Sequence, residues 1–295
     1  MIGEQKKLVR DSAAPLLRGP QRIVCLTEEP TEVLYAIGEQ DRIVGISGFT
    51  VRPARARREK PKVSAFTSAK IAEILKLEPD LVIGFSDIQA EIARELIAAG
   101  VEVWISNHRS VAGILDYIRR LGALVGTAGK ADALACRAEE HIAKVERAVS
   151  ERAAPALARR PRVYFEEWDE PMISGIRWVA ELVRIAGGDD IFPERAEKSL
   201  ARDRIIADPS EVIRRAPDII VGSWCGKRFR ADKVAARAGW DKIPAVRDGQ
   251  LFEVKSPLIL QPGPAALFDG LDALHRIISA WARQAQPLTG ARQDR

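Results

Sequence analysis

Four acidic side chains lie close together near the middle of the chain, where carboxylates could transfer protons or bind a hard metal ion. They are Glu166, Glu167, Asp169 and Glu170. Both kinds of chemistry need carboxylates that converge on one point. The residues before them form an apolar run that predicts a β-strand, and successive side chains of a strand point to opposite faces. Glu166 and Glu167 are therefore not expected to form a catalytic pair.

The histidines and cysteines are too dispersed for a metal site or a disulfide framework. They are His108, His141, His275, Cys25, Cys136 and Cys225. Zinc sites and iron–sulfur clusters need ligands at short, regular spacings, which this set lacks. The chain also has no glycine-rich phosphate loop, dinucleotide-binding fingerprint or Gly-x-Ser-x-Gly elbow. We therefore expect no enzyme activity and no intrinsic cofactor.

A second set of side chains could bind a large, flat ligand. In an open α/β sheet, ligands bind beyond the carboxyl ends of the strands, and aromatic residues recur at those ends here. They are Phe49, Phe66, Phe85, Trp168 and Trp224. Each ring can bury roughly 150–250 Å², although each also suits ordinary core packing. Trp168 and Trp224 are the strongest candidates, because each follows its predicted strand among polar or charged neighbours.

Charged residues at the same strand ends extend this candidate site. Arg52 and Arg228, the latter in a basic run at residues 227–230, could contact a ligand phosphate or an anionic chelate. Glu167 and Cys225 complete the candidate ligand contacts. Cys225 could approach a metal centre, but an inert free thiol is the simpler interpretation, because no activating neighbour is visible in the sequence.

A repeat relates the two halves of the chain. Glu73, Pro79, Asp80 and Gly84 recur as Glu211, Pro217, Asp218 and Gly222, each 138 residues later. Each copy predicts a short helix stopped by Pro-Asp and then a strand, because proline cannot donate a helical hydrogen bond. The apolar runs at residues 81–83 and 219–221 are typical of strands buried on both faces of a parallel sheet. The repeat therefore predicts two similar α/β lobes with a cleft between them.

The rest of the chain fits two Rossmann-like lobes joined by one long helix. Further strands are predicted at residues 22–27, 42–47, 102–106, 162–166 and 250–254, and helices at 31–37, 91–99, 111–121, 178–186, 231–238 and 264–282. Residues 128–152 carry a single apolar stripe at helical spacing, and ~25 helical residues span roughly 37 Å. The predicted parts are an N-terminal lobe at 21–127, a connecting helix at 128–154, a C-terminal lobe at 155–283 and flexible ends at 1–20 and 284–295.

This plan resembles the class III substrate-binding proteins of ABC importers, which carry cobalamin, ferric siderophores or haem. The resemblance covers residues 21–282 and rests on residues 22–32, the strand end at residues 44–47, both Pro-Asp units and residues 185–192. Residues 164–175 are similar to the cobalamin-binding branch in particular. The resemblance implies a non-enzymatic protein that binds a corrinoid between its lobes, with a ferric siderophore or haem as alternatives. Some chelatases and nitrogenase-like reductases share the plan, so an enzyme is the alternative of another class.

The resemblance also implies a partner. In this family one surface glutamate of each lobe docks onto arginines of the membrane permease, and the matching residues are Glu73 and Glu211. Each is also simply a favourable residue near the start of a helix, where the helix dipole stabilises negative charge. We therefore expect a possible ABC permease as partner and a monomeric binding protein.

Composition indicates an ordinary globular protein. The 295 residues are 46% hydrophobic and 29% charged, with a net charge of +5. Basic residues gather at 52–62, but no nucleic-acid-binding module surrounds them, so we expect a solvated loop and no nucleic-acid partner. No segment reaches ~18 consecutive apolar residues, so no membrane insertion is expected. With no signal peptide or lipobox in the sequence as written, the expected location is the cytoplasm, or the periplasm if the start codon is misassigned.

Overall fold

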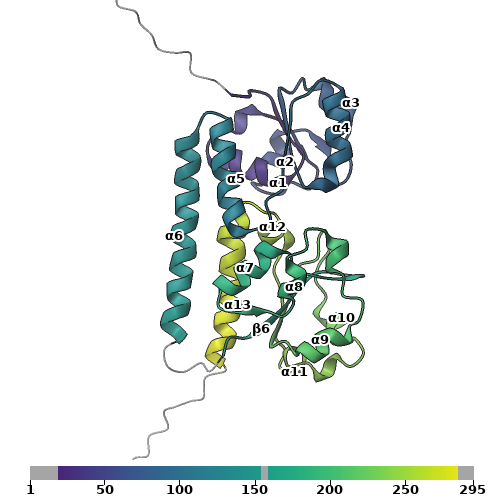
Figure 1. The fold of residues 1–295 in the computed structure, drawn as a ribbon, viewed down its shortest axis with the longest axis vertical. Helices are drawn as coiled ribbons and strands as arrows, with labels where there is room; N and C mark the ends of the chain where they lie inside the picture. Colours follow the sequence, from purple (N-terminus) through teal and green to yellow (C-terminus); the bar gives the residue numbers. More distant parts are fainter. Residues whose placement is uncertain (1–18, 154–158, 285–295) are drawn as a thin grey trace, which may run out of the picture.

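The computed structural model describes residues 19–153 and 159–284, which form two α/β lobes and a long helix that spans both (Figure 1). This arrangement confirms the predicted fold class. The predicted ends of the chain, apart from residues 19, 20 and 284, and the predicted junction between residues 154 and 155 lie outside the described residues. The other predicted domain boundaries stay predictions.

The N-terminal lobe contains a fully parallel sheet with the strand order β3-β2-β1-β4-β5. Its strands are β1 (Ile23–Cys25), β2 (Ile43–Ser47), β3 (Lys62–Ser64), β4 (Leu81–Phe85) and β5 (Val103–Ser106). Its helices are α1 (Glu28–Ala36), α2 (Ala56–Glu59), α3 (Ile71–Lys76), α4 (Ala90–Ala98) and α5 (Val111–Leu124). Every residue of β4 is buried, as its unbroken apolar run predicts. The basic segment predicted to be a loop contains the short helix α2.

The C-terminal lobe has the strand order β10-β9-β6-β7, with β8 beside the start of β6. Its strands are β6 (Arg162–Asp169), β7 (Met172–Ser174), β8 (Asp189–Asp190), β9 (Ile219–Gly222) and β10 (Leu251–Glu253). Its helices are α7 (Arg177–Ile185), α8 (Pro193–Ala196), α9 (Ser210–Arg215), α10 (Ala231–Ala235), α11 (Pro244–Arg247), α12 (Ser256–Ile259) and α13 (Leu271–Gln284), and a π-helical turn at Ala266–Gly270 precedes α13.

The sequence pattern does not predict the antiparallel hairpin of β6 and β7. Because β7 pairs with the end of β6, this strand continues to Asp169 instead of ending at Glu166. Glu167 and Trp168 therefore lie within a strand, and the expectation that Trp168 follows its strand is wrong.

The repeated Pro-Asp units have a common structural role. The Asp80 carboxylate accepts hydrogen bonds from the backbone N–H groups of Gln21 and Arg22, at 2.6 and 2.8 Å, just before β1. Asp218 accepts one from the backbone N–H of Arg162, at 2.8 Å, at the start of β6. In both lobes this aspartate fixes the start of one central strand against its neighbour, which explains why the repeat retains it.

The connecting helix α6 (Ala128–Ala153) runs beside α5 and then beside α13, so it passes along both lobes (Figure 1). A Cβ atom added at Gly122 of α5 would lie 2.0 Å from the Cβ of Ala131, so α5 and α6 meet where only a glycine fits. One hydrophobic core runs without a break through α5, α6, α7 and α13 into both sheets. This shared core favours small hinge movements over a wide separation of the lobes.

Candidate functional site

Polar side chains from both lobes come close enough for their charges to interact. Glu28, Arg109 and Cys225 follow β1, β5 and β9, Glu167 lies near the end of β6, and Arg204 ends a 3₁₀ turn and pairs with Glu167. We call six of them the interlobe site: Glu28, Glu29 and Arg109 of the N-terminal lobe, and Glu167, Arg204 and Cys225 of the C-terminal lobe. Burial is the main cause of the raised pKa of the Cys225 thiol and of the lowered pKa of Arg109, and charges across the lobes add to both shifts: Glu28 acts on Cys225, and Arg204 acts on Arg109. The two halves of the site therefore lie within electrostatic range of each other.

Two buried carboxyl groups open helix α1. Glu28 is 8% and Glu29 1% exposed, and the Oε2 atoms of both have no hydrogen-bond partner among the described residues. Thr27 donates its hydroxyl to Glu29 Oε1 at 2.7 Å. Burial raises the pKa of Glu28 to about 7 and that of Glu29 to about 8. Near neutral pH Glu29 is therefore mostly protonated and Glu28 about half protonated, and a protonated carboxyl can donate as well as accept a hydrogen bond.

Arg109 lies on the same face, just after β5. Its Nη2 donates to Ser86 Oγ at 2.8 Å, and its guanidinium lies 4.5 Å from the centre of the Phe85 ring. Its Nε is buried and has no partner in the described part of the chain. Burial lowers the pKa of Arg109, as expected for a cation that has lost part of its hydration. Arg109 and the two glutamates thus present polar atoms that a bound ligand could satisfy.

The C-terminal half of the site is more fully bonded. Arg204 is 2% exposed and forms a bidentate pair with Glu167, at 2.5 and 3.0 Å. Its Nη1 also donates to the carbonyl of Ser174, at 2.5 Å. Both oxygens of Glu167, a predicted ligand contact, are therefore already engaged by a buried cation.

Glu166 points to the opposite side of β6, as the strand alternation predicts. This carboxylate is fully buried and accepts hydrogen bonds from Arg237, at 2.5 and 3.0 Å, from Trp224 Nε1 at 3.0 Å and from the Tyr164 hydroxyl at 3.0 Å. It belongs to the interior of the C-terminal lobe and is not part of the interlobe site.

The predicted aromatic walls divide into two groups. Phe49 and Phe66 are 51% and 36% exposed, and Trp168 is partly exposed. Phe85 and Trp224 are 5% and 3% exposed, because Phe85 packs against Trp178 and His108, and Trp224 packs in the core of the C-terminal lobe. Phe49 and Phe66 are open to a ligand in this conformation, and Phe85 and Trp224 fit the core-packing alternative. Trp168 is intermediate, because it packs against the C-terminal core and the Lys227 ammonium lies 4.2 Å from the centre of its ring. All five ligand-binding roles stay predictions.

Arg52, predicted to contact a ligand phosphate, is occupied by a contact between the lobes. Its Nε lies 3.2 Å from Glu32 Oε1, and its Nη2 lies 2.5 Å from Asp269 Oδ2 in the C-terminal lobe. The backbone N–H of Ala265 also donates to Glu32, at 3.0 Å. In this structure Arg52 therefore ties the lobes together, and its ligand-binding role stays a prediction.

Cys225 is an exposed residue, but the atoms packed around its sulfur remove part of the hydration of the thiol. This burial raises the pKa of its thiol, and the negative charges of Glu28 and Glu167 add to the effect. The thiol is therefore protonated near neutral pH, which agrees with its interpretation as an unreactive free cysteine. Among the described residues, no group of three or more His, Cys, Asp or Glu side chains is arranged to hold a metal ion.

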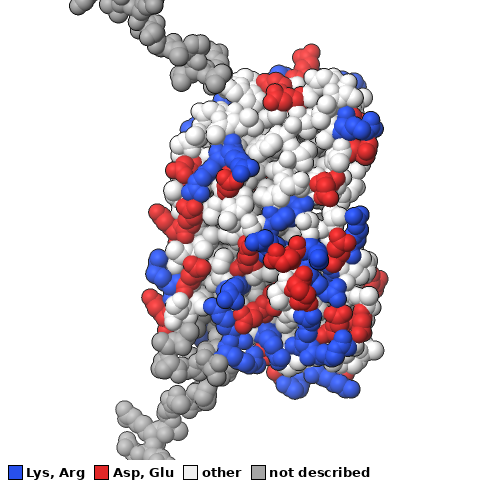
Figure 2. All heavy atoms as spheres, viewed as in Figure 1, with Lys and Arg blue, Asp and Glu red and all other residues white. Residues whose placement is uncertain are grey.

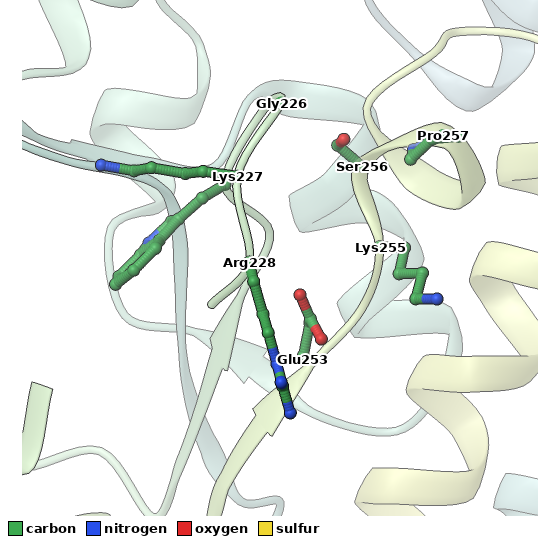
Figure 3. Close-up of a pocket in the computed structure, with 8 residues that line it drawn as sticks. Gly226, Lys227, Arg228, Glu253, Lys255, Ser256 and Pro257 are labelled. Carbon is green, nitrogen blue, oxygen red and sulfur yellow. The ribbon is translucent and has the colours of Figure 1, made fainter. Parts of the chain in front are cut away.

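A pocket of about 590 Å³ adjoins Cys225 at the carboxyl ends of β9 and β10 (Figure 3). Lys227, Arg228 and Lys255 contribute positive charge to its lining, and Glu253 is its acidic residue. Figure 3 shows Arg228 and Lys255 on either side of Glu253, while Lys227 extends away from them. The Lys227 ammonium lies 4.2 and 5.0 Å from the rings of Trp168 and Trp224 and forms an ion pair with Asp169.

The two predicted docking glutamates differ in their surroundings. The Glu73 side chain is 53% exposed and pairs with Lys76 at 2.9 Å. Glu211 is 23% exposed and accepts two hydrogen bonds from Arg195, both 3.0 Å long. Figure 2 shows many charged side chains of both signs on this face of the C-terminal lobe and broader uncharged areas on the N-terminal lobe. Glu211 is thus part of an ion-pair network, whereas Glu73 is accessible.

Four residues of the interlobe site were not predicted: Glu28, Glu29, Arg109 and Arg204. For the glutamates a sequence signal existed, since two acidic residues follow an apolar strand at the carboxyl edge where ligands bind. Acidic residues also suit the first turn of any helix, so this signal is weak without knowledge of burial. Arg109 lies in a loop and Arg204 ends a short 3₁₀ helix, and the sequence of neither segment shows that these side chains are buried.

Comparison with known proteins places the chain in a defined group. The family model for periplasmic binding proteins matches residues 23–258. The vitamin B12-binding protein of Vibrio parahaemolyticus is 24% identical over 251 residues, which cover 84% of this chain and 86% of that protein. Among the described residues, no helix combines the length and the hydropathy needed to span a bilayer.

Solved structures share the fold. The periplasmic vitamin B12-binding protein of Vibrio cholerae superposes with a TM-score of 0.70 at 21% identity, covering 91% of this chain and 99% of that one. A periplasmic haem-binding protein from Roseiflexus sp. RS-1 gives a TM-score of 0.72 at 23% identity, covering 88% and 100%. Proteins named for different ligands thus superpose equally well, so the fold alone does not identify the ligand.

Proposed function

The chain belongs to the periplasmic binding protein family, and we propose that it binds a cobalamin-type corrinoid between its two lobes as the substrate-binding component of an ABC-type uptake system. The corrinoid is the cargo of this protein and not a catalytic cofactor. The observation that carries the proposal is the pair of buried carboxyls, Glu28 and Glu29, whose Oε2 atoms have no partner among the described residues. The curated relative named for vitamin B12 supports the same ligand class.

The chemistry of the interlobe site favours a corrinoid over haem. Neutral carboxamide side chains surround a corrin ring, whereas haem carries two carboxylates. Protonated carboxyls complement carboxamides, because they donate to the amide oxygen and accept from the amide nitrogen. A haem carboxylate beside Glu28 and Glu29 would raise the energy of every ionised form of the three groups. Partly exposed Trp168 and the exposed Phe49 and Phe66 would supply apolar contact to the ring.

Titration of the purified protein with cyanocobalamin tests the proposal. We expect saturable quenching of tryptophan fluorescence and a shift of the corrin absorption band, with a dissociation constant on the order of micromolar or lower. Trp168→Ala should weaken binding by about tenfold or more, since it would remove an aromatic ring that we propose contacts the ligand. Trp224→Ala is a poor test, because this side chain is buried against Glu166.

Ile97→Ala, at an exposed position of helix α4, is the matched control and should bind as the wild type does. Saturable binding of haemin or a ferric siderophore without any response to cyanocobalamin would replace the corrinoid with one of these alternatives. Wild-type affinity in Trp168→Ala would exclude Trp168 from the site.

We further propose that Glu73 and Glu211 dock the loaded protein onto a permease outside the cytoplasm. Exposed Glu73 is available for an arginine of the partner, whereas Glu211 would first have to exchange its bond to Arg195. Glu73→Ala should reduce corrinoid uptake by cells about fivefold or more and leave the affinity for corrinoid in solution unchanged. Glu91→Ala, which removes another exposed helical glutamate, should transport normally. Normal uptake in the Glu73→Ala and Glu211→Ala double variant would contradict the docking role.

A further inference from the structure

The basic pocket beside Cys225 is not explained by binding of a neutral, amide-substituted ring. Its volume is about 590 Å³, and its lining includes Gly226, Arg228, Glu253, Lys255 and Ser256. Arg228 and Lys255 form no ion pair with another described residue, although such pairs are frequent elsewhere in the C-terminal lobe. Two cations therefore face this pocket without carboxylate partners.

The pocket and the interlobe site are connected. Trp224 and Gly226, the chain neighbours of Cys225 on either side, both line the pocket, as does Ser256. Cys225 in turn lies close enough to Glu28 and Glu167 for their charges to affect the pKa of its thiol. A ligand bound between the lobes could thus extend past Cys225 into the basic pocket. Gly226 has a φ of +76° at this point, and a Cβ there would meet no atom within 4 Å, so the turn leaves open space beside the two cations.

The one acidic group of the lining does not cancel this charge. Glu253 Oε1 accepts a hydrogen bond from the backbone N–H of Phe229 at 3.0 Å, which directs that oxygen toward the chain. Lys227 is neutralised separately by Asp169. Arg228 and Lys255 carry two positive charges and Glu253 carries one negative charge. The net charge of +1 from these three residues suits a ligand group with a single negative charge. A guanidinium and an ammonium are the side chains that bind phosphate oxygens through charge-assisted hydrogen bonds.

We propose that this pocket binds the phosphodiester of the nucleotide loop of a complete corrinoid, with Arg228 and Lys255 as its phosphate contacts. The inference rests on the proposed function and deepens it. The interlobe site would hold the neutral ring, and the basic pocket would distinguish corrinoids that carry the nucleotide loop from those that lack it.

Parallel titrations with cyanocobalamin and dicyanocobinamide test the proposal, because dicyanocobinamide has the corrin ring but neither the phosphodiester nor the terminal base. The wild type should bind cyanocobalamin at least tenfold more tightly. In the Arg228→Gln and Lys255→Gln double variant this preference should fall to about twofold, with the affinity for dicyanocobinamide unchanged. Raising the salt concentration should weaken binding of cyanocobalamin only.

Lys233→Gln, at an exposed lysine of helix α10, is the matched control and should retain the wild-type preference. Equal affinity of the wild type for both corrinoids would overturn the inference. A double variant that keeps the wild-type preference would also overturn it. Either result would leave the proposed function intact. If the wild type binds neither corrinoid, the proposed function fails, and this inference fails with it.

Discussion

Replacing Arg237 by alanine is expected to lower the free energy of unfolding by about 3–5 kcal/mol, because the substitution leaves a buried carboxylate without its cation. Glu166 is fully buried, and Arg237 supplies two of the hydrogen bonds that it accepts. Tyr164 and Trp224 supply the others, and neither carries a charge. Urea denaturation followed by far-ultraviolet circular dichroism measures the loss.

Two further variants separate this effect from a general loss of charge. Arg247→Ala removes an exposed arginine that pairs with Asp248 at 3.1 Å, and it should change the free energy of unfolding by less than about 1 kcal/mol. Arg237→Lys keeps a positive charge and should retain part of the lost stability. A decrease of under 1 kcal/mol in Arg237→Ala would mean that the buried pair of Arg237 and Glu166 contributes little to the stability of the folded state, contrary to this expectation.

Stability should fall as the pH rises from 6.5 to 9. Burial raises the pKa of Glu28 from its ordinary value of 4.5 to about 7 and that of Glu29 to about 8. A group whose pKa is higher in the folded state stabilises that state most below its unfolded pKa, and this contribution is lost as the pH passes the folded pKa. Between pH 6.5 and 9, ionisation of the two groups should lower the free energy of unfolding by roughly 3 kcal/mol.

The Glu28→Gln and Glu29→Gln double variant should show a much flatter pH profile, because glutamine fills the same space without ionising. Urea denaturation of both proteins at pH 6.5 and 9 measures the difference. His108, whose pKa burial lowers to about 4, acts in the opposite direction but mainly below pH 6.5. Burial raises the pKa of Asp190 to about 7, and this residue contributes equally to the pH dependence of both proteins. Identical pH profiles would show that Glu28 and Glu29 ionise normally.

The repeat shows how much of the fold the sequence could predict. Two Pro-Asp units, each before an unbroken apolar run, indicate two buried parallel strands, and the structure has β4 and β9 at these positions. The apolar stripe of α6 was equally informative, because helical periodicity depends only on local spacing. What these patterns did not reveal was that Asp80 and Asp218 brace the starts of β1 and β6.

The candidate site was harder to predict, because its residues are defined by contacts distant in sequence. Arg52 suits an anionic ligand when only its neighbours are considered, but its partner Asp269 lies 217 residues away. The polar end of β6 interrupts the apolar pattern, and only its pairing with β7 shows that the strand continues. Glu28 and Glu29 have ordinary residue types for a helix start, and only the packing around them shows their burial.

A crystal structure of the protein grown with cyanocobalamin is the most direct test of where and what the chain binds. We expect the corrin ring between the lobes, with its amide groups within hydrogen-bond distance of Glu28 and Glu29 and its edge against Trp168. A corrinoid bound on an outer surface would contradict the proposed function. So would crystals in which the two lobes have the arrangement described here but hold no corrinoid between them.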